Sequence, residues 1–574
     1  MSGLDWIVLF TTLSTIVVYG IYKSRGTVNI DGFLLGNKSF PWYHVTLSVM
    51  ATQASAITFL SAPGLAFSSG MAFVQFYFGL PLAMIVLCIT FVPIFHRLKV
   101  YTAYEFLENR FDLKTRALTA FLFLVQRGLS TGISIYAASI ILSTVLNIDT
   151  TFTTVFIGSV VVIYTVYGGT KAVSYTQLLQ MSVIFSGLLL AGILVVNLLP
   201  ETVGFGKALQ IAGKMGRTNA IDFSFDWNNQ YTVWSGLIGG FFLQLSYFGT
   251  DQSQVGRYLT GSSISQSRLG LLMNGLVKIP MQFLILLIGV LVFTFYQYHQ
   301  PPVFFNSYEL GKLEKSQYAP ELNKIKSDYT NAFNDKQTEV KKLEIALDAN
   351  DESAINSQRV LLQNADKKTK AIRQQAVELM QKNDPDADTN DNNYVFLSFI
   401  TRYLPHGLIG LLIAIVFLAS MGSTASALNS LASTTVIDIY KRLINKQDSD
   451  KKYLSVSRWA TVIWGFFCIL MALYASKMGN LIEAVNILGS LFYGTILGIF
   501  VVAFYLKKIG GSATFMAAII TEVIVFACWW SNIMAFLWLN VVGCVLLVVF
   551  AYAIQIKENR KSRLFPEGSR VSPD

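Results

Sequence analysis

Long apolar runs are the feature that most restricts how this 574-residue chain can fold. Runs of about 18 or more apolar residues, enough to cross ~30 Å of hydrocarbon, recur along most of the sequence. Hydrophobic residues make up 53% of the chain and charged residues 14%, whereas a soluble protein carries roughly a quarter charged residues. The sequence therefore predicts an all-α polytopic membrane protein.

About thirteen transmembrane helices are expected, and the charges between them indicate their orientation. Lysine and arginine gather around 97–116 and 441–458 and in the tail at 557–570. Alternating the spans puts all three groups on one side, which is then cytoplasmic, and the N-terminus outside. The predicted spans lie near 4–22, 42–66, 72–96, 118–146, 151–167, 175–199, 231–251, 270–297, 404–437, 458–476, 480–506, 512–530 and 533–556.

The net charge of +10 is interpreted as this orientation signal, so no nucleic-acid partner is expected. The expected surroundings are a lipid bilayer, and the expected location is the cell membrane, as a multi-pass protein of the bacterial inner membrane.

Residues 299–393 do not fit the membrane pattern, because they are rich in Lys, Glu, Gln, Asp and Asn. Within them, KKLEIALDANDESAINSQRVLLQNADKKTKAIRQQAVELMQK combines strong helix formers with apolar residues at three-four spacing. We expect an extracytoplasmic helical hairpin that acts as a solvated cap or a partner surface, with a regulatory role left open. The other predicted parts are an extra N-terminal helix at 1–23, a membrane core at 40–298 and 394–506, two C-terminal helices at 507–557 and a cytoplasmic tail at 558–574.

Three spans contain polar and helix-breaking residues, which a membrane tolerates only where they line a cavity or are buried in protein. The second reads VTLSVMATQASAITFLSAPG, the seventh FFLQLSYFGTDQSQVGRYL and the ninth FLASMGSTASALNSLASTTVIDIY. Close packing of small residues explains the alanines and glycines of the ninth span but not its many hydroxyls. Two interrupted spans five apart are typical of an inverted-repeat transporter, whose unwound backbone offers free carbonyls and helix ends to ion and substrate.

The segments YFGTDQSQVGRYL, SALNSLASTTVIDIY and YGGTKAVSYTQLLQ together resemble the sodium/solute symporter family. The resemblance implies a LeuT-like fold of five-plus-five inverted repeats, formed here by the second to sixth and the seventh to eleventh spans. Residues 40–298 would hold the first repeat and the beginning of the second, and 394–506 the rest. The implied activity is import of a small organic solute by alternating access, with Na+ as the coupling ion.

The same resemblance implies a sodium site made of carbonyl and hydroxyl oxygens, the hard ligands that sodium prefers. By correspondence with the family, the carbonyls belong to Ala51, Ala54 and Ala419 and the hydroxyl to Ser423. Gly422 occupies a position that is often serine, so that either Thr424 replaces the missing ligand or the site has one oxygen fewer. The alternative is that these hydroxyls only pack helices together.

A second sodium site, found in some members of the family, is predicted to be absent. Those members carry aspartate where this chain has Gln177, and serine or threonine where it has Ala425. A neutral amide cannot compensate a second cation as a carboxylate does, so one sodium per cycle is expected. The segment around Gln177 is expected to be a cytoplasmic loop that turns at Gly168-Gly169 and leads into the next core helix.

Candidate solute-binding residues lie in the same interrupted spans and beside two intramembrane cations. Ser55 and Thr58 match a pair that sialic acid carriers of the family use on a carboxylate, and Arg127 matches an arginine that grips it. The remaining candidates are Gln53, together with Gln244, Tyr247 and Lys278, which match positions near the sugar in sugar carriers. Arg127 could instead form an ion pair or reach the cytoplasmic surface, and Lys278 could be structural. Two cations facing the cavity favour a sugar acid such as sialic acid, and a neutral sugar next.

Other interpretations stay open at this point. A sensor or channel-like homologue would bind its ligand without concentrating it, although the tail after 556 is short for a signalling domain. A proton-coupled carrier would need an ionisable carboxylate near the ion site, for which Asp251 and Asp438 are the candidates; Asp251 and Gln252 are expected rather to brace the unwound backbone. An enzyme is not expected, because the four histidines lack metal-ligand spacing and no catalytic motif has a suitable setting.

Overall fold

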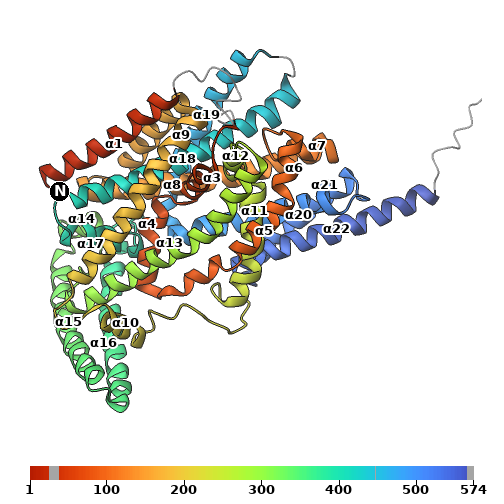
Figure 1. The fold of residues 1–574 in the computed structure, drawn as a ribbon. Coiled ribbons are helices and arrows are strands. Elements are labelled where there is room, and N and C mark those ends of the chain that lie inside the picture. The colour runs from red at the N-terminus through yellow and green to blue at the C-terminus, as the bar shows by residue number, and fades with distance from the viewer. Residues whose placement is uncertain (25–37, 446–447, 565–574) are drawn as a thin grey trace, which may run out of the picture.

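The computed structural model describes residues 1–24, 38–445 and 448–564, and the regular elements in these ranges are all helices. Ten helical stretches within the described ranges are long and apolar enough to cross a membrane, and one bent pair adds an eleventh span. Figure 1 shows them gathered into one bundle from which a pair of long helices projects. The all-α, polytopic architecture is thereby confirmed, while the count of thirteen spans and the outside N-terminus stay predictions.

The first interrupted span is a broken helix. The elements up to residue 214 are α1 (Gly3–Ser24), α3 (Trp42–Gln53), α4 (Ala56–Ser69), η2 (Met71–Tyr77), α5 (Leu80–Ile89), α6 (Phe91–Leu98), α7 (Glu105–Arg110), α8 (Leu113–Leu146), α9 (Thr150–Asn197) and α10 (Phe205–Lys214). Helices α3 and α4 are bent by 63° at Ala54 and Ser55, which are both extended. The last carbonyls of α3 and the first N–H groups of α4 therefore have no partner within the helix.

Helix α9 corrects one prediction. The sequence predicted two spans, at 151–167 and 175–199, joined by a loop that turns at Gly168-Gly169; the structure instead has one helix of 48 residues that continues through both glycines. Each glycine costs a helix only about 1 kcal/mol relative to alanine. Because each added residue also gains a hydrogen bond once a helix has nucleated, two long flanking helical stretches outweigh that cost.

The second interrupted span is broken in the same way. It comprises η3 (Ser235–Gly239), α11 (Gly240–Thr250) and α12 (Gln252–Tyr258), and α13 (Ile264–Tyr298) follows it. A single extended residue, Asp251, separates α11 from α12. Gln252 braces this break, because its amide accepts a hydrogen bond from the Ala103 N–H (3.1 Å) and donates one to the Tyr101 carbonyl (2.8 Å). The two breaks thus occur in the two spans where the sequence predicted them.

The polar segment forms the predicted hairpin. Its elements are α14 (Ser307–Glu314), α15 (Ala319–Asp348), α16 (Glu352–Asn383) and η4 (Asp391–Asn393). Helices α15 and α16 bury the three-four spaced residues Val340, Leu343 and Leu362 against each other, and Figure 1 shows the pair projecting from the bundle. The chain then returns through α17 (Val395–Tyr403), α18 (Leu408–Thr434), η5 (Thr435–Ile444), α19 (Asp450–Tyr474), η6 (Ala475–Met478), α20 (Leu481–Tyr505), α21 (Gly511–Trp530) and α22 (Phe536–Leu564).

The returning end of the hairpin is fitted closely onto α4, which yields a prediction about stability. A Cβ at Gly64 would lie 1.8 Å from the Asn392 carbonyl oxygen, while Ser61 Oγ donates a hydrogen bond to Asn393 Oδ1 at 2.8 Å. We expect Gly64→Ala to lower the stability by about 1–3 kcal/mol, because backbone must move to admit the methyl group. Apparent melting temperatures of the purified variants would measure this. Gly206→Ala is the matched control, since nothing lies within 4 Å of its added Cβ; equal melting of both variants would contradict the close fit.

Candidate ion and solute site

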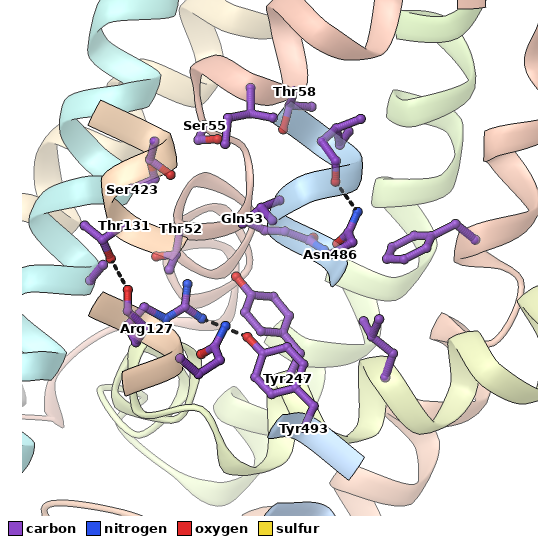
Figure 2. A pocket seen from close by; sticks show the side chains of 18 of the residues that line it. Thr52, Gln53, Ser55, Thr58, Arg127, Thr131, Tyr247, Ser423, Asn486 and Tyr493 are labelled. Atoms are coloured by element: carbon purple, nitrogen blue, oxygen red, sulfur yellow. Dashed lines mark hydrogen bonds between the residues drawn. The ribbon is translucent and has the colours of Figure 1, made fainter. Parts of the chain in front are cut away.

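A polar cavity of about 100 Å³, called here the central cavity, adjoins the break between α3 and α4. Figure 2 shows side chains from several helices converging on it. Its lining consists of Thr52, Gln53, Ser55, Ile57, Thr58, Phe76, Tyr77, Gln126, Arg127, Thr131, Ser134, Leu243, Tyr247, Ser423, Ala427, Ile482, Val485, Asn486 and Tyr493. Five of the predicted solute residues, Gln53, Ser55, Thr58, Arg127 and Tyr247, are in this lining, and so is the predicted ion ligand Ser423.

The predicted sodium ligands come from two helices that the structure brings together. Ala51 and Ala54 lie at the end of α3, and Ala419, Ser423 and Thr424 lie in the middle of α18. Direct contact between the two helices is made by Thr52 Oγ1 and Ser426 Oγ, 3.2 Å apart. The Thr424 hydroxyl is buried with no hydrogen-bond partner among the described residues. A buried hydroxyl without a partner is a possible ligand for a cation, which prefers hard oxygen atoms.

Gln177 lies at this junction although it is distant from it in sequence. Its Oε1 accepts a hydrogen bond from Ser48 Oγ at 2.7 Å, and its Nε2 donates to Thr52 Oγ1 at 3.2 Å and to the Gly422 carbonyl at 3.3 Å. The amide therefore ties α9 to α3 and α18 with neutral hydrogen bonds. Ala425 is fully buried and its side chain offers no oxygen. Together with Gln177, it is the residue from which we predict that a second sodium site is absent.

Arg127 is held by an ion pair. Its guanidinium pairs with Asp251, the residue at the break between α11 and α12, and donates a hydrogen bond to Tyr493 Oη at 3.1 Å. Tyr493 in turn donates to Asp251 at 3.0 Å, and the guanidinium lies over the ring of Tyr247, 5.5 Å from its centroid. The ion-pair alternative for Arg127 therefore describes this structure, with its charge compensated at the wall of the central cavity.

The opposite end of the cavity is the start of a helix. Ser55 is the N-cap of α4, its side chain caps no backbone N–H, and it lines the cavity together with Thr58. Figure 2 shows Ser55 and Thr58 at the upper end of the cavity and Arg127, Tyr247 and Tyr493 at the lower end. The N-terminus of a helix carries unpaired N–H groups and a partial positive charge, and so favours an anion.

Two predicted solute residues lie behind the cavity wall. Gln244 is fully buried on α11, and neither its Nε2 nor its Oε1 has a hydrogen-bond partner among the described residues. Lys278 on α13 is also fully buried, with its ammonium 5.7 Å from the centroid of the Tyr77 ring. Tyr77 lines the cavity, whereas Gln244 and Lys278 are absent from its lining.

Sequence reasoning missed the contribution of α20. Tyr493 and Asn486 of this helix both line the central cavity, seven residues apart and so on one helical face. This spacing of two polar residues within an apolar span could have indicated them. Gln126 and Thr131, which flank Arg127 on α8, also line the cavity without having been predicted.

Asp438, the other carboxylate considered for proton coupling, lies away from the central cavity in η5. Its Oδ1 is 2.6 Å from Arg116 Nη2 and accepts a hydrogen bond from Thr102 Oγ1 at 2.8 Å. Arg116 also contacts Glu108 at 2.8 Å. Asp438 and Asp251 thus both belong to ion pairs, which is the ordinary condition of a carboxylate buried between helices.

Two broken helices beside a polar cavity at the centre of an apolar bundle define a secondary transporter of the LeuT-like type. The sequence matches the model of the sodium:solute symporter family over residues 33–309 and 383–521, and the chain belongs to this family. It is therefore a multi-pass membrane transporter that uses Na+ as the coupling ion to import a solute, and not an enzyme.

Individual relatives agree with this assignment. The sodium/sialic acid symporter SiaT of Proteus mirabilis is 24% identical over 555 residues, which cover 95% of this chain and 93% of that protein. Sodium-coupled monocarboxylate transporter 1 of Xenopus laevis is 27% identical over 501 residues, 86% of this chain and 67% of that protein, so this chain spans about two thirds of its length. The structure of a substrate-bound, outward-open Na+-coupled sialic acid symporter has the same fold, with a TM-score of 0.75 at 21% identity over 97% of this chain and 98% of that chain.

The ion pair at the cavity wall yields a prediction from a double-mutant cycle. Arg127→Ala alone leaves Asp251 charged and buried, and we expect a loss of roughly 3–5 kcal/mol. Adding Asp251→Ala should recover part of that loss, because the double variant contains no unpaired charge. Thermal unfolding of the purified variants measures both effects, with the exposed Arg97→Ala as control. Losses that simply add would show that the two side chains are not coupled.

Proposed function

We propose that the chain imports a small carboxylate-bearing solute, a sugar acid such as sialic acid, together with one sodium ion per cycle. The observation that carries this proposal is the N-terminus of α4, which opens into the central cavity with the hydroxyls of Ser55 and Thr58 beside it. Two of the relatives support it, a sialic acid symporter and a monocarboxylate transporter, since sialic acids and monocarboxylates both carry a carboxylate.

The carboxylate of the solute binds at Ser55 and Thr58. Unpaired N–H groups and the partial charge of the helix end stabilise an anion there without a formal positive charge. Arg127 is the less suitable partner, because Asp251 already compensates its guanidinium. This assigns the two ends of the cavity to different parts of the solute.

The remaining hydroxyl or amide groups of the solute face the other end. Arg127 and Tyr493 supply donors and acceptors there, and the Tyr247 ring offers an apolar face. Asn486 lies between the two ends in Figure 2. Gln53 lies between the two ends in Figure 2 and can contact either part. Gln244 and Lys278, which are buried behind the wall, support the cavity without touching the solute.

Sodium binds where α3 meets α18. Its ligands are the carbonyls of Ala51, Ala54 and Ala419 and the hydroxyls of Ser423 and Thr424. Because Ser423 also lines the central cavity, an ion at this site lies next to the solute and stabilises the same arrangement of α3 and α18. Coupling then arises because each ligand favours one of two conformations of the transporter.

A short monocarboxylate is the second candidate solute. The central cavity measures about 100 Å³ in this structure, which is below the roughly 300–1,000 Å³ of sites for larger ligands. A lactate-sized molecule needs no widening of the cavity, whereas a sugar acid does. A partner protein at residues 299–393 and the inner membrane as the location stay predictions.

Removal of the Ser423 hydroxyl tests the ion site. Ser423→Ala should raise the sodium concentration for half-maximal uptake at least tenfold, because the ion loses a ligand that the neighbouring Ala427 cannot replace. Uptake of N-acetylneuraminate and of lactate into proteoliposomes under a sodium gradient measures this. Ser433→Ala is the control, because Ser433 lies on the same helix but outside the cavity lining.

Sodium-dependent uptake by the unaltered chain should have a Hill coefficient near one. A value near two, or uptake that is equal in potassium, would contradict the proposal.

The reverse experiment would build the second sodium site. Gln177→Asp combined with Ala425→Ser places a carboxylate and a hydroxyl where other family members have them, and we expect the Hill coefficient for sodium to rise from about one towards two. Gln177→Glu without the second change is the matched control for added charge. If the double variant transports with an unchanged Hill coefficient, the absence of these two groups does not set the stoichiometry.

A further inference from the structure

A second and larger cavity lies between the hairpin and the end of the bundle to which the hairpin is attached. This outer cavity, of about 350 Å³, is bounded by the ends of α4 and α13 and by α15 and α16. The family model leaves residues 310–382 unmatched, and these are the residues that supply the α15 and α16 side of the cavity. This side of the cavity therefore lies outside the residues that match the family model.

The charge of the outer cavity is unbalanced. Its lining has four basic residues, Arg217, Lys336, Lys370 and Arg373, and two acidic ones, Asp366 and Asp391. Asp366 is shared by Lys336 (2.8 Å) and Lys370 (2.9 Å), and Asp391 pairs with Arg373. Four cations and two carboxylates leave a surplus of two positive charges in a partly buried space.

Arg217 forms no ion pair with any carboxylate that the structure describes. It donates a hydrogen bond to the Ser68 carbonyl at the end of α4, and its guanidinium lies 4.9 Å from the centroid of the Phe293 ring. Its Nε is buried and has no hydrogen-bond partner in the part of the chain that the structure describes. Burial lowers the pKa of Arg217 and of Lys336, which means that their surroundings penalise positive charge that an anion would compensate.

The rest of the lining suits an organic anion better than an inorganic one. Gln297 is 1% exposed, and its Oε1 has no partner among the described residues, so it can accept a hydrogen bond from a hydroxyl or N–H group of a ligand. Phe67 and Phe293 contribute aromatic surface, with ring centroids 5.7 Å apart. One compact ligand could satisfy all three features. Its carboxylate would lie near Arg217, its hydroxyl or N–H group would donate a hydrogen bond to Gln297, and its apolar part would pack against the two rings.

We infer that the outer cavity is a second binding site, for a small organic anion that carries a carboxylate together with hydroxyl or N–H donors. Phe67 and Ser68 of this site are in the last turn of α4, and Ser55 and Thr58 of the central cavity are at its start. The 14 residues of α4 span about 21 Å. The outer cavity is thus a separate site at the other end of α4. The inference that it binds the transported solute rests on the proposed function.

The test is isothermal titration of the purified, full-length chain with N-acetylneuraminate and with lactate, in sodium and in potassium. The outer cavity contains none of the proposed sodium ligands, so its binding should persist in potassium and in Ser423→Ala. Arg217→Ala should weaken this sodium-independent binding at least tenfold, whereas Arg217→Lys should retain part of it. Arg359→Ala, an exposed change on the same hairpin, should leave it unaltered.

Lys370→Gln is a second variant that tests the same site if Arg217→Ala does not fold. The Lys370 side chain is 59% exposed, so its replacement should leave the fold intact and weaken sodium-independent binding by about threefold, as loss of one partly screened charge does. Binding that requires sodium and Ser423, and that neither Arg217→Ala nor Lys370→Gln alters, would overturn the outer site and leave the proposed function standing. Arg217-dependent binding in potassium without any sodium-dependent component would support the outer site and contradict the proposed function. Absence of Arg217-dependent binding with both probes would overturn the outer site.

Discussion

The cost of an unpaired backbone group inside a bilayer is the constraint on which the rest of this structure depends. Helices α3/α4 and α11/α12 both stop inside the bundle, so their last carbonyls and first N–H groups need partners that lipid cannot supply. Side chains from neighbouring segments meet part of that need, as when Tyr104 donates a hydrogen bond to the Thr250 carbonyl at 2.8 Å. In the proposed function, a sodium ion and a solute complete the pairing of the groups that remain at the α3/α4 break.

Two sets of contacts hold the walls of that cavity. One connects α8, the α11/α12 break and α20 through Arg127, Asp251 and Tyr493. The other connects α3, α9 and α18 through Thr52, Ser426 and Gln177. The proposed sodium ligands all belong to the second set of helices, whereas the proposed solute reaches from α4 to the first set. A solute that contacts both α4 and the first set of helices therefore changes the relative stability of two arrangements of the walls. Such a shift between two conformations is what alternating access requires.

How much the sequence could predict depended on how local each signal was. The breaks at Ala54 and Asp251 were predictable because polar residues interrupt apolar runs there, and the hairpin because its apolar residues repeat at helical spacing. The partner of Arg127 was not predictable, since Asp251 is 124 residues away and only packing brings them together. Gly168-Gly169 led to a wrong prediction of a turn, because the helical stretches on both sides outweigh this local signal. Gln244 and Lys278 have the polarity of cavity residues, and only the rotation of α11 and α13 decides that they point elsewhere.

The amide of Gln177 has a consequence for the energetics of the whole cell. On the proposed stoichiometry, one sodium ion and one carboxylate cross together, and their charges cancel. The membrane potential, which supplies about 2.3 kcal/mol per elementary charge per 100 mV, then does no net work on the cycle. The steepest solute gradient that such a carrier can maintain equals the sodium gradient, whereas a second sodium ion would square that ratio and add the electrical term. On this proposal, one neutral side chain between α3 and α18 limits how far uphill the solute moves and makes that limit insensitive to voltage.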